Sequence, residues 1–107
     1  MPKKIYVPGA IVEAVYGYEQ TNIDYYVITK RSGQFVTLQA IGKKNIKELP
    51  DALRGTCEPD PDNVLDEKPI RRKVHVNARG EESGIAIKSY GWASLWDGRP
   101  SVWTEYA

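Results

Sequence analysis

The chain has 107 residues, the size of a single domain with a thin hydrophobic core. Its net charge of +1 argues against a dedicated DNA-binding protein, whose surface is strongly basic. One cysteine and one histidine exclude an internal disulfide and a metal site built from several such ligands. We therefore predict one domain over residues 1–107, with no metal and no cofactor.

The sequence lacks the long apolar segments of a membrane or secreted protein. The N-terminus has no apolar leader segment, and no window approaches 18 consecutive apolar residues. We therefore expect a soluble, cytoplasmic protein that does not bind membranes.

The first half of the chain alternates apolar and polar residues with a period of two, which is typical of strands. The pattern predicts strands over 10–16, 24–30 and 34–41, the last two joined as a hairpin through a turn at Gly33. In the third strand Val36, Leu38 and Ala40 share one face, so we expect that face to be buried.

The middle of the chain breaks this pattern. Residues 45–56 form the one short stretch with helical character, and Pro50 limits it to a turn or two. Residues 57–69 contain three prolines and five acidic residues, which is typical of an exposed loop. We therefore predict a long loop or short helical turn at about 42–70.

Strand patterns return after residue 70. We predict strands over 71–78, within 84–96 and over 101–107, separated by turns. In the first of them Val74, Val76 and Ala78 should point inward and Lys73 and His75 outward; in the second, Ile85 and Ile87 should point inward. Many short strands with frequent turns favour a small, strongly bent β-barrel of the SH3-like kind, because closure removes exposed strand edges.

The residues that could support catalysis are few. His75 is expected on the outer face of a strand, and a nucleophilic pair with Cys57 is the one arrangement that would use it. Glu19 and Asp24 could act as acid and base, but their spacing fits a polar loop equally well. There is no glycine-rich phosphate loop. We therefore predict no catalytic residues and no enzymatic activity.

Residues 16–26, YGYEQTNIDYY, combine tyrosines with side chains that both donate and accept hydrogen bonds. The candidate binding residues here are Tyr18, Gln20, Asn22 and Asp24. Such a mixture recognises base edges and peptide backbones. A capped loop is the alternative, because Asn and Asp side chains also hold tight bends.

Residues 89–100, SYGWASLWDGRP, contain a second candidate group. Tyr90, Trp92 and Trp96 fall on one strand face if the strand continues, and Asp97 follows them. They could stack on a base or clamp a peptide, or they could be an ordinary core row.

Arg71, Arg72 and Lys73 are candidate phosphate contacts. Neighbouring residues of a strand point to opposite faces, so at most two of the three can share a surface. A solvated strand entry is the alternative interpretation.

The motif YGYEQTNIDYY, followed about a dozen residues later by VTLQAI, resembles a family of small proteins carried by phages, plasmids and related mobile elements. Their N-terminal motif reads approximately Trp/Tyr-Gly-Tyr-Glu/Asp-Gln-Thr-Asn-Ile/Val-Asp-Phe/Tyr-Tyr. The later segments KPIRRKV and SYGWASLWDG are also similar, with Gly91 and Arg99 standing where Ala and Lys are expected. The resemblance covers most of the chain beyond the first ten residues.

The resemblance implies a context: a short accessory protein, in the host cytoplasm, directed at a host process. It favours one compact site in which Tyr18, Gln20, Asn22 and Asp24 meet Tyr90, Trp92, Trp96 and Asp97. The leading hypothesis is a non-catalytic module that binds a host protein or complex. The alternatives are a small nucleic-acid-binding barrel and a pocket for a small molecule or nucleotide.

Overall fold

A computed structural model describes residues 5–16, 22–48, 54–88, 91–98 and 101–104. This part of the chain forms eight β-strands. They are β1 (Ile11–Tyr16), β2 (Asn22–Ser32), β3 (Phe35–Glu48), β4 (Arg54–Val64), β5 (Ile70–Val76), β6 (Glu82–Lys88), β7 (Gly91–Leu95) and β8 (Ser101–Thr104). Within these ranges there is no helix, and hence none long and apolar enough to cross a membrane.

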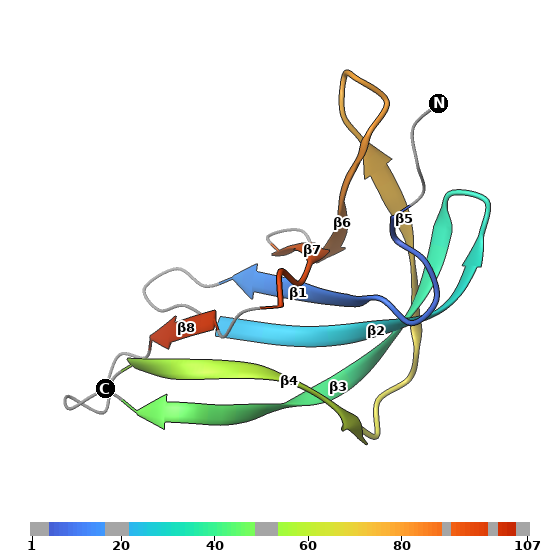
Figure 1. Ribbon diagram of the computed structural model, residues 1–107. Helices are drawn as coiled ribbons and strands as arrows, with labels where there is room; N and C mark the ends of the chain where they lie inside the picture. The colour runs from blue at the N-terminus through green and yellow to red at the C-terminus, as the bar shows by residue number, and fades with distance from the viewer. Residues whose placement is uncertain (1–4, 17–21, 49–53, 89–90, 99–100, 105–107) are drawn as a thin grey trace.

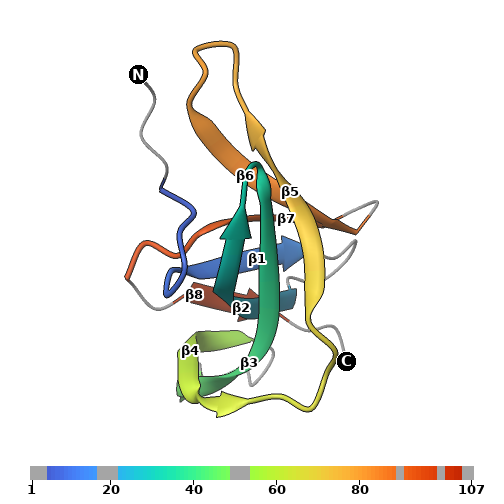
Figure 2. The ribbon, with the colours of Figure 1, turned by 90° about the vertical axis from the view of Figure 1, so that its right-hand side faces the viewer.

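Six antiparallel strands close into a barrel, which confirms the predicted mostly-β fold (Figures 1 and 2). The strands follow one another in the order β2, β1, β7, β6, β5, β3, and pairing of β3 with β2 closes the ring. The 14-residue β3 continues beyond the barrel, where it pairs with β4, which in turn pairs with β8. We call β4, β8 and this second half of β3 the arm.

The first hydrophobic core fills the barrel. Val36 and Leu38 are fully buried in it and Ile85 joins them from β6, as the alternation of apolar residues predicted. The predicted hairpin turn between β2 and β3 is also confirmed, because Gly33 has a φ of 61°, which side chains other than glycine rarely adopt.

A second core lies between the barrel wall and the arm. It consists of Ile23, Tyr25, Ile41 and Cys57, with Trp96 packed against it. The Tyr25 hydroxyl donates a hydrogen bond to the Cys57 carbonyl, with 3.4 Å between the two oxygens. The Trp96 ring packs edge-on against the Tyr25 ring, with 6.4 Å between the ring centres. The arm therefore covers the outer face of β2 and is not a free extension.

The predicted loop or helical turn at about 42–70 is wrong. Residues 42–48 continue β3, residues 54–64 form β4, and Cys57 is buried rather than exposed in a loop. Prolines are tolerated in β4 because β8 pairs only with Arg54–Cys57, so Pro59 and Pro61 lie where β4 has no hydrogen-bonded strand on that side among the described residues. The helical segment at 45–56 is likewise not formed by its described residues, and only residues 65–69 keep the loop character.

The inward pattern predicted for β5 holds for Val74 alone. Val76 is 51% exposed and Ala78 lies beyond the strand. The register shifts between His75 and Val76, and such a bulge interrupts the alternation of faces.

A buried ion pair binds the N-terminal segment at one end of the barrel. Arg31 on β2 and Glu82 on β6 form a two-point pair with N–O distances of 2.6 and 3.0 Å, and both side chains are less than a tenth exposed. Glu82 also accepts hydrogen bonds from the backbone N–H groups of Ile5 and Tyr6, while Arg31 donates to the Tyr6 carbonyl. The buried Tyr6 side chain belongs to the first core, so this segment seals one end of the barrel.

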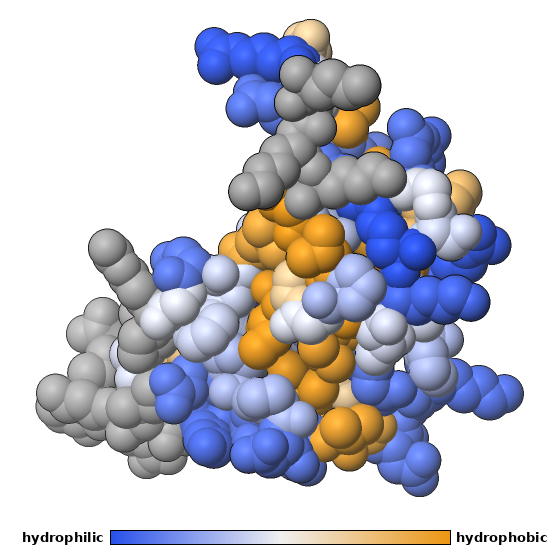
Figure 3. All heavy atoms as spheres, turned by 45° about the vertical axis from the view of Figure 1, so that its right-hand side comes forward, coloured by the Kyte–Doolittle hydropathy of each residue, from blue (hydrophilic) through white to orange (hydrophobic). Residues whose placement is uncertain are grey.

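The outer surface is not uniformly polar. Figure 3 shows hydrophobic side chains gathered in a band across one face, with hydrophilic side chains on either side. Several large apolar residues are at least 40% exposed, among them Val15, Phe35, Val76 and Trp92. Exposed apolar residues mark a contact surface where they form a contiguous patch.

The Arg31–Glu82 pair predicts a specific pH dependence of stability. The hydrogen bonds from Arg31 lower the pKa of Glu82 from 4.5 to about 2, with smaller help from the Ile5 and Tyr6 amides against the cost of burial. Because the folded-state pKa is the lower one, the stabilisation is present above pH 4.5 and is lost as the pH falls towards 2. Glu82→Gln should lower the free energy of unfolding by about 3 kcal/mol at neutral pH.

Urea unfolding of the wild type and Glu82→Gln across this pH range measures that difference. It should shrink as the solution is acidified. Glu81→Gln, which changes the exposed neighbouring carboxylate, serves as the control and should stay within about 0.5 kcal/mol of the wild type. A Glu82→Gln effect that is small or independent of pH would contradict the role given to the pair.

Candidate functional site

Strand β5 presents a row of cationic and titratable side chains on the outside of the barrel. Arg71, Lys73 and His75 are exposed, whereas Arg72 and Val74 between them are partly or fully buried. Alternate residues of a strand are about 6.6 Å apart on one face. The prediction that the consecutive basic residues cannot all share a surface is therefore confirmed, and Arg72 is the one that turns inward.

An aromatic ring lies beside this row on β3. Phe35 pairs in register with Lys73 and is 40% exposed, and the Arg71 guanidinium lies 4.5 Å from the centre of its ring. Lys30 on β2 lines the same shallow depression, about 320 Å³ in volume, as Phe35 and Arg71. Along Phe35–Gln39 and β5 none of the described residues is acidic, so this surface is locally basic although the whole chain is nearly neutral.

A second exposed aromatic lies at the far end of the row. Trp92 on β7 is 46% exposed, and its ring lies 5.3 Å from the His75 ring. The indole packs over Gly84 of β6, where a side-chain Cβ would come within 3.0 Å of indole atoms. Glycine at this position therefore makes room for Trp92 to lie against β5. We call Lys30, Phe35, Arg71, Lys73, His75 and Trp92 together the β5 face.

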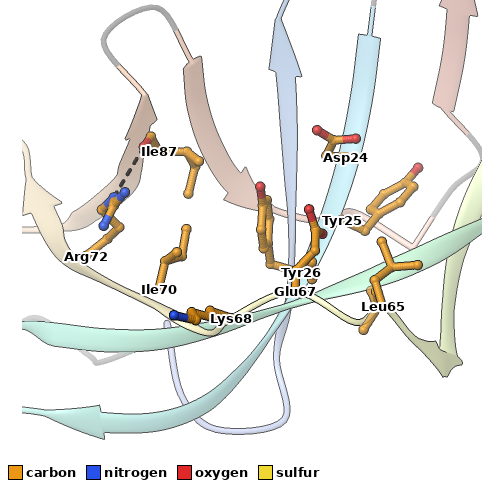
Figure 4. Close-up of a pocket in the computed structure, with 11 residues that line it drawn as sticks. Asp24, Tyr25, Tyr26, Leu65, Glu67, Lys68, Ile70, Arg72 and Ile87 are labelled. Carbon is orange, nitrogen blue, oxygen red and sulfur yellow. Dashed lines mark hydrogen bonds between the residues drawn. The ribbon is translucent and has the colours of Figure 1, made fainter.

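The other end of the barrel has a separate cavity of about 370 Å³, which we call the mouth (Figure 4). It lies at the start of β2 and β5 and the end of β6, opposite the end sealed by Tyr6. Arg72 reaches it and is held by hydrogen bonds from Nε to the Ile87 carbonyl and from Nη1 to the Arg71 carbonyl. Burial raises the pKa of Tyr26 at its centre, and the carboxylates of Asp24 and Glu67 raise it further while Arg72 lowers it.

The structure separates the described members of the predicted compact site. Asp24 lines the mouth, Trp92 lies on the outer wall, and Trp96 packs against the second core beyond the end of β7. Asp97 is exposed after β7. Tyr18, Gln20 and Tyr90 lie outside the described residues, as does the side chain of Asn22.

Sequence reasoning missed Phe35 and Lys30 on the β5 face and Glu67 in the mouth. A signal for Phe35 existed, because it precedes Val36 in a strand whose even-numbered residues are buried, so the only phenylalanine of the chain had to point outward. Glu67 gave no such signal, since it lies in an irregular segment brought to the barrel end by β4 and β5.

The pair of Cys57 and His75 considered for nucleophilic catalysis is not formed. Cys57 is fully buried beside Tyr25, whereas His75 lies on the outer wall against Trp92. Glu19 lies outside the described residues, so its pairing with Asp24 stays untested. Across the described ranges, no three His, Cys, Asp or Glu side chains gather as metal ligands would.

Comparison with known proteins adds no relative: no family model, no curated protein and no solved structure matches the chain. The function of this protein is therefore inferred from the β5 face and the mouth alone.

The packing of Trp92 over Gly84 predicts the effect of adding one methyl group. Gly84→Ala should displace the indole from β5, because the new Cβ and the ring cannot occupy the same space. The indole N–H signal of Trp92 in a ¹H–¹⁵N NMR spectrum, assigned with Trp92→Phe, should shift strongly, while the signals of the other two tryptophans stay nearly unchanged. Ser94→Ala, a change at an exposed position on β7, serves as the control and should leave all three signals in place. An unmoved Trp92 signal in Gly84→Ala would show that the indole does not lie over Gly84.

Proposed function

We propose that this protein is a non-catalytic binding module that holds a single-stranded nucleic acid on the β5 face. The observation that carries the proposal is the row of Arg71, Lys73 and His75 between two exposed aromatic rings, Phe35 and Trp92. Proteins that bind single strands combine cationic groups along the backbone with aromatic platforms on which bases stack. Both parts are present on one barrel wall.

The arrangement favours a single strand over a duplex. Stacking on Phe35, Trp92 or the plane of the Arg71 guanidinium requires bases whose faces are free, which a duplex does not offer. Three adjacent interstrand spacings separate β3 from β7 through β5 and β6, a width of about 14 Å. This is enough for a few nucleotides, so the site is short.

The charge of the chain sets the expected strength. Lys30, Arg71 and Lys73 are the lysines and arginines of the face, so about three phosphate contacts are available. For a single strand each contact adds about 0.7 to the salt slope of the logarithm of the binding constant, which gives a slope near −2. Binding should therefore be weak and should rely on stacking as well as charge.

A protein of the host cell is the second candidate ligand. Trp92 and its cross-strand neighbour Val15 are 46% and 45% exposed, and together they form an apolar patch next to the β5 face. Tryptophan is one of the residue types enriched among the residues that contribute most to protein interfaces. The resemblance to phage and plasmid proteins makes a cytoplasmic host protein the expected partner, with no role for a membrane.

Fluorescence anisotropy with a labelled dT12 oligonucleotide tests the leading proposal. Phe35→Leu should weaken binding by about 1–3 kcal/mol because it removes a stacking ring but keeps an apolar side chain. Lys73→Gln should reduce the magnitude of the salt slope by about 0.7, because it removes one phosphate contact.

Lys44→Gln is the matched control, since Lys44 is an exposed lysine on β3 beyond the barrel, near Asp60 of the arm. It should leave both the affinity and the salt slope close to those of the wild type. Equal effects of Lys73→Gln and Lys44→Gln, or no binding of dT12 at low salt, would refute the nucleic-acid site. Retention of a captured host protein by Phe35→Leu but not by Trp92→Ala would support the second candidate instead.

A further inference from the structure

The mouth is a second site, distinct from the β5 face. Its volume of about 370 Å³ lies within the range of pockets that hold small organic ligands, about 300–1,000 Å³. Its apolar lining comes from Ala40, Ile41, Leu65, Ile70 and Ile87, together with the ring of Tyr26. Such a lining can accept the apolar faces of a small molecule.

The charged groups of the mouth are divided between two sides. Figure 4 shows Arg72 and Lys68 on one side of Tyr26, and Asp24 and Glu67 on the other. The influence of Asp24, Glu67 and Arg72 on the pKa of Tyr26 shows that all three lie close enough to the phenol to interact with it. The ligand therefore needs hydrogen-bond acceptors along one edge and donors along the opposite edge, and no net charge in the ring itself.

Arg72 is held in place on one side of the mouth. Two backbone carbonyls, those of Ile87 and Arg71, hold its Nε and Nη1 atoms at 3.2 and 2.9 Å. Its Nη2 atom donates no hydrogen bond to the described residues, so part of the guanidinium fork remains available. An arginine held in this way can donate its remaining N–H groups to acceptor atoms of a ligand.

We propose that the mouth binds a guanine base. Guanine presents two acceptors, O6 and N7, on one edge, and this is the pair that arginine recognises best among the bases. Its other edge carries the N1–H and N2–H₂ donors, which a carboxylate such as that of Glu67 accepts. Adenine lacks this separation, because its N6 amine donates next to N7. The base can come from a free guanine nucleotide or from a guanine within a strand.

Titration calorimetry with guanosine, inosine and adenosine 5′-monophosphates tests the proposal on the full chain. The guanine nucleotide should bind, inosine, which lacks the N2 amine, should bind about tenfold more weakly, and adenosine should bind more weakly still. Glu67→Gln should reduce the preference for guanosine over inosine. Because Glu67 is exposed, this variant should remain folded, which a thermal melt followed by circular dichroism verifies.

Arg72→Lys tests whether guanine is recognised by the shape of the guanidinium or only by its positive charge. It keeps the positive charge but removes the fork, so it should weaken the guanine nucleotide about tenfold. Glu81→Gln, at an exposed carboxylate on the β5–β6 turn, is the control and should leave the preference unchanged. Equal affinity for the guanine and adenine nucleotides, or an unaltered guanine preference in both mouth variants, would overturn the proposal.

Two further measurements distinguish the two possible sources of the base. If the ligand is a free nucleotide, guanosine monophosphate alone should saturate the mouth. If the ligand is a guanine within a strand, a dT12 analogue with one central dG should bind at least tenfold more tightly than dT12. Both outcomes support the guanine site. Binding of dT12 itself reports on the β5 face, so Glu67→Gln should not affect it, and the two sites can fail separately.

Discussion

The pairing of β3 on both of its edges is the constraint on which the rest of the structure depends. On one edge β3 pairs with β2 along Phe35–Ile41; on the other it pairs first with β5 and then with β4. The first half closes the barrel, and the second half leaves it to carry the arm. Two cores result, one inside the barrel and one between its outer wall and the arm, so a chain of this size gains buried area without a larger barrel.

The two ends of the barrel differ because the N-terminal segment covers only one of them. At that end the Arg31–Glu82 pair is satisfied from several directions by backbone groups of Ile5, Tyr6 and Gly33. Such satisfaction is what makes a buried ion pair tolerable in a thin core. The other end is bordered by the segment between β4 and β5 and holds a cavity edged by charged groups. The asymmetry gives the proposed guanine site its place.

The β5 strand connects the two candidate sites. Its alternation sends Arg71 and Lys73 to the outer wall and Arg72 to the mouth, so three consecutive basic residues serve different surfaces. A nucleic acid on the β5 face and a base in the mouth would thus contact neighbouring residues of one strand. The local concentration of positive charge on this strand matters more than the net charge of the chain, because phosphate contacts act over short, screened distances.

The sequence by itself determined the class of the fold. Alternation of apolar residues identified the strands that line the barrel, and the turn at Gly33 placed the first hairpin, because both signals are local properties of the chain. It also showed that Arg71–Lys73 must divide between two faces. The resemblance to phage and plasmid proteins stays a prediction, as does the SH3-like character of the barrel.

Only the tertiary structure decided where the surfaces meet. Residues 54–64 read as a loop because prolines and acids dominate them, and they became a strand because β3 offered a long edge to pair with. Phe35 and Trp92 come from strands far apart in sequence, and β5 and β6 bring them to one wall. Asp24, Glu67 and Arg72 likewise line one cavity only because β2, β5 and the segment between β4 and β5 come together there. Pairing between distant segments depends on the whole sheet, and no local pattern records it.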